Sequence, residues 1–421
     1  MLYECWRKIA TERASELALV ETGPGRRWTF RDLLLEEEKE RFAGGTLAFP
    51  TGRSCGFILT VLRAWRAGCV VCPVEPDQRA PAPAGRLPEG IVHLKTSSAS
   101  TGPASSIVFT APQLRADAGN IVGTMGLRPD WPNIGIVSLA HSYGFSNLVL
   151  PLLLHGVPLL LAESTLPESL RRAAEAAREV TLAGVPALWQ AWHAAGAIPG
   201  NVRLAISAGS PLPLALESSV FQHDGLKVHN FYGSSECGGI AYDVTAQPRS
   251  DPACVGSPIN GVAVSLAENG CLEVRSNAVG ESYWPEPKPG LSGGVFKTGD
   301  LAELQAGFVY LRGRAGDQIN VAGRKVSPES IEEVLRAHPR VRACLTFGVP
   351  GGQGPRGEII VACVAADPGV SAESLKQFAL AKLPAWQVPR EWWLLEDLPP
   401  GARGKLSRAE WRRKFLERQR S

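Results

Sequence analysis

Short apolar runs alternate with helical patterns between about residues 55 and 235. Residues 55–67 place apolar side chains at helical spacing and end at Gly68, and 69–74 follow as a strand-like run. Further strand-like runs cover 134–139, 157–161, 181–185, 202–207 and 226–229. This alternation predicts an α/β fold in which helices cover parallel sheets.

The pattern changes twice farther along the chain. After Tyr242, short strands separated by Gly and Pro predict a β-rich subdomain over about 243–315. From Gln318, two helical patterns among short strands are typical of a small α+β domain. The sequence therefore predicts a large N-terminal domain over 1–315 and a small, mobile C-terminal domain over 316–421.

Composition supports a folded chain of more than one domain. Among 421 residues, 44% are hydrophobic and 20% are charged, which excludes a mainly disordered chain and a coiled coil. The net charge of +3 is too small to indicate nucleic acid as a partner. Positive charge concentrates in residues 403–421, which suits binding of phosphates or an acidic partner and equally suits a solvated terminal helix.

The chain carries no sign of export or membrane insertion. Nine cysteines, an odd number without a repeated metal-binding pair, predict reduced thiols. The first residues are charged throughout. The most apolar stretch, 148–161, is interrupted by prolines and is shorter than the roughly 20 residues that a membrane helix needs. We expect a soluble, cytoplasmic protein without a membrane span.

One segment has the composition of a phosphate-binding loop. Residues 95–109 crowd hydroxyl-bearing side chains among small ones, and the N–H and O–H groups of such a loop can converge on phosphate oxygens. A Ser/Thr-rich surface turn has the same composition, so this segment alone leaves both interpretations open.

Two glycine turns carry a carboxylate. Ser235 and Glu236, in a turn after a predicted strand, suit an α-phosphate and Mg²⁺ respectively. Asp300 follows Thr298-Gly299 and suits a ribose diol, and the strand between Asp300 and Arg314 can bring both to one edge. Each turn alone is also compatible with ordinary loop chemistry.

A glycine-flanked lysine occurs near the end of the chain. Lys405 follows Gly404, and a lysine on a flexible loop of a small mobile domain can enter a site and neutralise charge as a phosphoester forms. An isolated Gly-Lys pair is also typical of an exposed basic loop.

In this order, the segments resemble the adenylate-forming superfamily of acyl-CoA synthetases, aryl-acid ligases and peptide-synthetase adenylation domains, from about Trp28 to Arg408. Residues 96–102 are similar to its phosphate loop, 207–212 to its adenine-side loop, and 232–236 to its Tyr-Gly-x-Thr-Glu motif. Residues 298–300 are similar to its ribose motif, 313–332 to its hinge motif, and 399–405 to its C-terminal lysine loop.

The resemblance implies a role for individual residues. Lys405, Ser235 and His141 would act in catalysis, and Glu236 would bind Mg²⁺. Nucleotide contacts would come from a larger set: Ser97, Ser98, Ser100, Thr101, Gly102, Ala208, Gly209, Ser210, Asn230, Tyr232, Gly233, Asp300, Arg314 and Lys325. The small domain would rotate between two half-reactions, adenylation of the acid and transfer of the acyl group to a thiol.

The chain departs from the family at two positions. Ser105 occupies the place of the usual phosphate-loop lysine, and Ala99 replaces the second glycine of that loop, so ATP affinity or pyrophosphate release can differ. Gly316 occupies the hinge position where Asp or Lys is common, which leaves the backbone free to rotate.

The substrate implied by the resemblance is a carboxylic acid, activated by ATP and transferred to coenzyme A or to the phosphopantetheine of an acyl carrier protein. Residues 141–144 resemble the segment that places a His near the substrate carboxylate. Amino-acid-activating members usually carry an Asp there, and none occurs between Ser138 and Leu150, so we expect an aromatic or fatty acid. A nucleotide-binding homologue with impaired catalysis and a stand-alone amino-acid-activating module are the alternatives.

Overall fold

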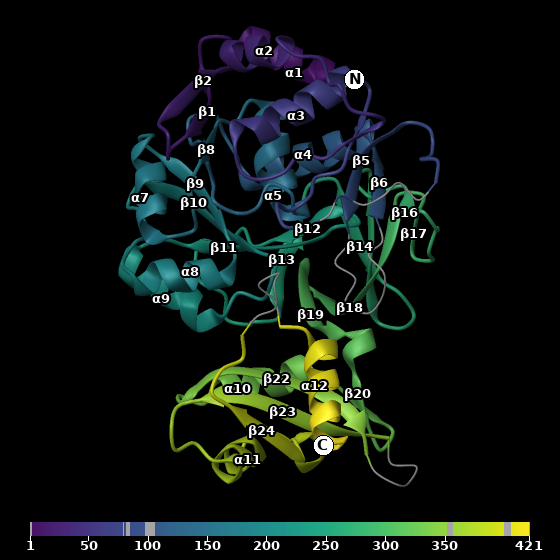
Figure 1. Ribbon diagram of the computed structural model, residues 1–421. Helices are drawn as coiled ribbons and strands as arrows, with labels where there is room; N and C mark the ends of the chain where they lie inside the picture. Colours follow the sequence, from purple (N-terminus) through teal and green to yellow (C-terminus); the bar gives the residue numbers. More distant parts are fainter. Residues whose placement is uncertain are drawn as a thin grey trace.

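The computed structural model describes residues 2–78, 80, 85–96, 106–351, 357–399 and 406–420. Figure 1 shows a large part that contains most of the chain and a smaller part formed by its C-terminal residues.

The largest sheet has 14 strands and joins a parallel half to an antiparallel half. Pairing is parallel among β1, β8, β7, β9, β10 and β11, and antiparallel from β11 through β12, β13, β19, β18 and β15 to β14. The strands, in spatial order, are β14 (Val262–Leu266), β15 (Cys271–Ser276), β18 (Val295–Gln305), β19 (Phe308–Arg314), β13 (Cys254–Pro258), β12 (Gly238–Tyr242), β11 (Val228–Ser234), β10 (Val202–Ala208), β9 (Val180–Gly184), β7 (Asn133–Gly135), β8 (Leu159–Leu161), β1 (Leu17–Glu21) and β2 (Arg26–Thr29), with β17 (Leu291–Ser292) paired to β18.

A second sheet of five strands contributes the segment that leads into the Ser/Thr-rich loop. Its strands are β16 (Ser282–Trp284), β6 (Ser106–Thr110), β5 (Ile91–Thr96), β4 (Val70–Val71) and β3 (Leu47–Ala48). Helix α4 (Ala111–Met125) contacts β12 of the large sheet and β5 and β6 of the small one, so it links the two sheets.

The remaining helices of the large part cover the sheets, and the predicted α/β fold is confirmed. They are α1 (Leu2–Glu12), α2 (Phe30–Glu38), α3 (Cys55–Arg66), α5 (Ser142–Gly144), the π-helix η1 (Phe145–Val149), α6 (Leu150–His155), α7 (Pro167–Glu175), α8 (Pro186–Ala194) and α9 (Leu214–Asp224). Figure 1 shows α7, α8 and α9 along one flank of the large sheet. The strand predicted over 134–139 ends earlier, at Gly135, because the chain then bends toward α5.

The C-terminal part is a three-stranded sheet with helices on both faces. Its strands are β22 (Val341–Pro350), β23 (Glu358–Ala366) and β24 (Glu391–Leu395), preceded by the hairpin β20 (Ile319–Val321) and β21 (Arg324–Val326). The helices are η2 (Ala315–Asp317), α10 (Pro328–Arg336), α11 (Ala372–Leu380), η3 (Ala385–Gln387) and α12 (Arg408–Arg420).

The continuous apolar run of β23 explains this layering. Ile360, Ala362 and Val364 pack into a cluster with residues of α10 and α11, whereas the alternate residues Val361 and Cys363 pack with α12. A strand buried on both faces has no polar alternation, which is the pattern in the sequence. These two clusters lie within residues 319–415, and the other buried clusters lie within 2–309. The boundary at 315/316 and the mobility of the smaller part stay predictions.

All nine cysteines are described and are free thiols. In the described part of the chain, no helix is both long enough and apolar enough to cross a membrane.

A buried charged cluster fixes the turn that follows β11. Lys95 Nζ lies 3.4 Å from Asp117 Oδ2 and 3.2 Å from Ser146 Oγ, and the Ser146 hydroxyl donates to the same carboxylate at 2.6 Å. These three residues are at most 4% exposed. The other oxygen, Asp117 Oδ1, accepts a hydrogen bond from the backbone N–H of Gly239 at 3.3 Å. Asp117 therefore ties α4 to the turn that carries Glu236.

Gly238 has no side chain, and the Asp117 carboxylate occupies the space that a side chain would fill. Its φ is +71°, and a Cβ there would lie 2.0 Å from Asp117 Oδ1. We expect Gly238→Ala to destabilise the protein by about 2 kcal/mol or more, from backbone strain and from displacement of a buried carboxylate. The measurement is chemical denaturation of Gly238→Ala beside Gly119→Ala, a change in α4 where an added Cβ meets nothing within 4 Å. Equal stability of the two variants would contradict this role of Asp117.

Candidate active site

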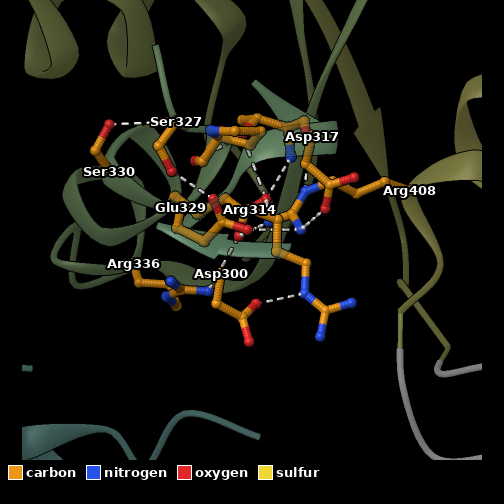
Figure 2. A network of polar contacts seen from close by, with 11 residues as sticks. Asp300, Arg314, Asp317, Ser327, Glu329, Ser330, Arg336 and Arg408 are labelled. Carbon is orange, nitrogen blue, oxygen red and sulfur yellow. Dashed lines mark hydrogen bonds and ion pairs between the residues drawn. The ribbon is translucent and has the colours of Figure 1, made fainter. Parts of the chain in front are cut away.

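The Asp300 carboxylate joins two strands at the centre of the candidate site. Asp300 of β18 pairs in register with Arg314 of β19, and Arg314 Nε donates to Asp300 Oδ1 at 2.9 Å (Figure 2). From β11, the Tyr232 hydroxyl donates to Asp300 Oδ2 at 2.5 Å. Three segments separated by as many as 82 positions in the chain thus meet at one carboxylate.

The electrostatics keep this group ready to accept hydrogen bonds. Burial, reinforced by the charge of Asp300, holds the pKa of Tyr232 well above its usual value, so the phenol remains a donor. The carboxylate in turn raises the pKa of Arg314, which remains a cation. An ionised carboxylate has about four lone-pair sites, so Asp300 can also accept hydrogen bonds from a ribose diol.

Glu236 lies in the turn between β11 and β12, held by its backbone and by one carboxylate oxygen. Its N–H donates to Ser234 Oγ at 3.2 Å, its carbonyl accepts from Gly280 N–H at 2.8 Å, and Tyr283 of β16 donates to Oε1 at 3.0 Å. Burial and the Glu236 charge raise the pKa of Tyr283, which keeps that donor protonated.

This carboxylate suits Mg²⁺ only in combination with other ligands. Within the described ranges, no group of three or more His, Cys, Asp or Glu residues could hold a metal ion. Mg²⁺ in nucleotide sites is held by one or two carboxylates together with phosphate oxygens and water. The carboxylate oxygens of Glu236 therefore fit Mg²⁺ that arrives with a nucleotide.

The same turn positions two other predicted residues. Ser235 is half-buried next to Glu236. Gly233 has no room for a side chain, because a Cβ there would lie 2.6 Å from the carbonyl oxygen of Gly238.

The predicted adenine-side loop follows the adjacent strand. Ser207 and Ala208 end β10, opposite Asn230 and Phe231 of β11 in a parallel register. Gly209 then adopts a φ of +88°, and Ser210 is exposed. The carboxyl ends of neighbouring parallel strands form the crevice where ligands bind in open α/β sheets.

A buried arginine that sequence reasoning missed holds the end of this loop. Arg249 donates to the Leu212 carbonyl at 2.7 Å and to Glu217 at 2.9 Å. Glu217 also pairs with Lys227, which contacts Asp243 at 2.6 Å. All four charged residues of this network are at most 8% exposed.

His141 lies at the start of α5, six residues after the end of β7, a strand that runs parallel to β9. It is the N-cap of α5, and its side chain is 59% exposed. Gly144 explains the His-x-x-Gly spacing, because a Cβ there would lie 1.9 Å from the Ser138 carbonyl oxygen. The glycine lets the first turn of α5 pack directly on the preceding chain.

Several predicted residues lie outside the described part of the chain, and one lies in the C-terminal part. Ser97, Ser98, Ser100, Thr101, Gly102 and Lys405 lie outside the described residues, as do Ala99 and Ser105. Lys325 is exposed on β21, in register with Asn320 of β20. Its predicted contact with a nucleotide stays a prediction, as do the roles of the other residues of the site.

Arg408 connects the segment after the candidate lysine loop to the hinge segment (Figure 2). Its guanidinium contacts Asp317 at 3.1 Å, Glu329 at 2.8 Å and Glu332 at 2.9 and 3.0 Å. Asp317 ends η2, directly after Arg314 and the predicted hinge residue Gly316. Three carboxylates thus anchor the first residue of α12 beside the hinge.

The ribose role predicts a specific defect. Asp300→Asn leaves the side-chain shape intact but removes the charge that Arg314 and Tyr232 both contact. We expect the dissociation constant for ATP to rise about tenfold or more, as for other charge-assisted hydrogen bonds. Titration calorimetry with ATP and Mg²⁺ measures this, and Glu303→Gln, an exposed change farther along β18, is the control. Wild-type affinity in Asp300→Asn would exclude Asp300 from the nucleotide site.

Comparison with known proteins identifies the family. The family of AMP-binding enzymes matches residues 86–288, and that of the AMP-binding enzyme C-terminal domain matches 330–405, together more than half of the chain. The chain is 26% identical over 357 residues to the 4-hydroxybenzoate–CoA/benzoate–CoA ligase of Rhodopseudomonas palustris, a match that covers 79% of this chain and 66% of that ligase. It is 27% identical over 346 residues to the probable 2-succinylbenzoate–CoA ligase of Mycobacterium tuberculosis, covering 78% and 86% of the two chains.

A solved structure has the same fold. The o-succinylbenzoate coenzyme A synthetase of Bacillus subtilis, in complex with ATP and magnesium ion, matches with a TM-score of 0.83 at 19% identity, over 97% of this chain and 99% of that one. The described strands, the convergence at Asp300 and both family matches lead to one conclusion: the chain belongs to the adenylate-forming superfamily of AMP-binding enzymes.

Proposed function

We propose that this chain is an ATP- and Mg²⁺-dependent ligase that joins an aromatic carboxylic acid to the thiol of coenzyme A. The observation that carries the proposal is the meeting of Tyr232, Asp300 and Arg314 beside the Glu236 turn. These groups match a ribose diol and a metal-bound phosphate. The benzoate and succinylbenzoate ligases among the relatives support an aromatic acid and coenzyme A.

The first half-reaction is adenylation. A carboxylate oxygen of the acid attacks the α-phosphorus of ATP, the bond to the bridging oxygen breaks, and pyrophosphate leaves. Glu236 would hold Mg²⁺, whose charge offsets that of the phosphates. Ser235 would contact the α-phosphate, Asp300 and Arg314 would bind the ribose, and Lys405 would neutralise charge as the phosphoester forms. Such chemistry depends on positioning and electrostatics more than on proton transfer.

The second half-reaction is thioester formation. The thiol sulfur attacks the acyl carbon of the adenylate, its proton passes to solvent, and AMP leaves with both electrons of the broken C–O bond. The phosphopantetheine thiol of an acyl carrier protein has the same chemistry as that of coenzyme A, so a comparison of the two acceptors decides between them.

The acid-dependent exchange of pyrophosphate into ATP tests this function. We expect exchange with benzoate-type acids to exceed that with fatty acids and with amino acids. An amino acid as the best substrate would instead identify an amino-acid-activating module. ATP binding without exchange for any acid would identify a homologue with impaired catalysis. Ser105, which occupies the place of the usual phosphate-loop lysine, is the residue that motivates this alternative.

The lysine prediction uses the same assay. Lys405→Ala should slow acid-dependent exchange by about 10²-fold or more, which is the effect of losing one preorganised charge. Arg403→Ala removes a positive charge from the same segment of the sequence and should retain exchange. An unchanged rate in Lys405→Ala would remove this lysine from the mechanism.

The hinge prediction separates the two half-reactions. Gly316 lies in η2, and a Cβ there meets nothing within 4 Å, so Gly316→Ala should be tolerated. Gly316→Pro fixes φ near −65°, close to the value of a 3₁₀ helix, and should hold the hinge in one conformation. We expect one half-reaction to stay within about twofold of wild type and the other to fall about tenfold or more. Wild-type rates for both half-reactions in Gly316→Pro would contradict rotation about this residue.

A further inference from the structure

His141 is contacted by a carboxylate from a distant loop, that of Glu75. Glu75 directly follows Val74, which forms a parallel bridge with Thr51 and donates its N–H to the Pro50 carbonyl. Glu75 Oε1 lies 3.2 Å from His141 Nε2. Glu75, 66 positions earlier in the sequence and directly after an isolated bridge, therefore contacts the histidine at the start of α5.

Ser138 also contacts Glu75. Ser138 Oγ donates to the same Glu75 oxygen at 2.5 Å and accepts a hydrogen bond from the backbone N–H of Ala140 at 3.2 Å. The bend between β7 and α5 is thus fixed to Glu75 at Ser138 and again at His141. This explains why the strand predicted over 134–139 ends early.

The contact with Glu75 determines which ring nitrogen can meet a ligand. Glu75 and His141 lie close enough for an ion pair, which requires the imidazolium, and this form carries a hydrogen on both ring nitrogens. Because Nε2 faces Glu75, the Nδ1–H group is left to donate to a bound carboxylate, which only accepts hydrogen bonds. Carboxylate partners of this kind commonly fix the orientation of a functional histidine.

The pair is too exposed for stability to explain it. The side chains of Glu75 and His141 are 27% and 59% exposed, and ion pairs in such surroundings contribute little to folding. We propose that Glu75 is a positioning residue: it orients His141 so that Nδ1 binds the carboxylate of the acid substrate. This inference rests on the proposed ligase function.

The first test compares substrate parameters in acid-dependent pyrophosphate exchange. Glu75→Ala should raise KM for the acid about three- to tenfold and leave KM for ATP unchanged, as expected from the loss of one partly exposed ion pair that orients the histidine. Glu75→Gln keeps the length of the side chain and one of its oxygens but not its charge, and should restore part of the loss. Asp77→Asn, an exposed change in the same turn, is the matched control and should behave as wild type.

The second test asks whether Glu75 acts through His141. In a His141→Ala background, Glu75→Ala should have no further effect on KM for the acid, because its partner is already absent. An undiminished effect in that background would overturn the inference, and so would a wild-type KM for the acid in Glu75→Ala. If Glu75→Ala lowers the melting temperature, KM for the acid in Glu75→Gln decides the test instead. A wild-type protein without acid-dependent exchange would instead refute the proposed function.

Discussion

The geometry of the site depends on one carboxylate shared by three strands. Asp300 accepts hydrogen bonds from Arg314, on the strand paired with its own, and from Tyr232 of β11. At β11 the parallel half of the sheet meets the antiparallel half. Because two donors already face this group, its orientation is set before a ligand binds. A carboxylate oriented in advance binds a diol at a lower entropic cost than a mobile one. The antiparallel strands β18 and β19 therefore supply two of the three residues that meet there.

Charged side chains with several partners fix other segments of the chain in the same way. Asp117 fixes the Glu236 turn, Arg249 fixes the end of the predicted adenine-side loop, and the half-buried Arg408 fixes the start of α12 to the predicted hinge segment. Burying a charge is costly unless it is paired, so these networks stabilise the fold less than apolar packing of similar size would. What they contribute is a defined position for loops whose backbones would otherwise have few constraints. Glu75 does the same for His141, at the surface.

Much of this arrangement could be predicted from the sequence. The alternation of apolar runs predicts the parallel half, and the spacing between Asp300 and Arg314 predicts the edge at which they pair. The partners that orient the site were missed, because long-range pairing of charged residues leaves no periodic signal. Asp117 did leave a signal in the sequence. It lies at helical spacing with Leu114 and Ile121 on the buried face of α4, where a charge requires a partner. Glu75 left none, since its contact with His141 joins two loops that are 66 positions apart in the sequence.

The most direct measurement is a crystal structure of the protein with ATP and Mg²⁺. The account predicts one nucleotide with its ribose hydroxyls within hydrogen-bonding distance of the Asp300 carboxylate and its metal-bound phosphates beside Glu236. A nucleotide bound elsewhere, with Asp300 in contact only with Tyr232 and Arg314, would contradict it.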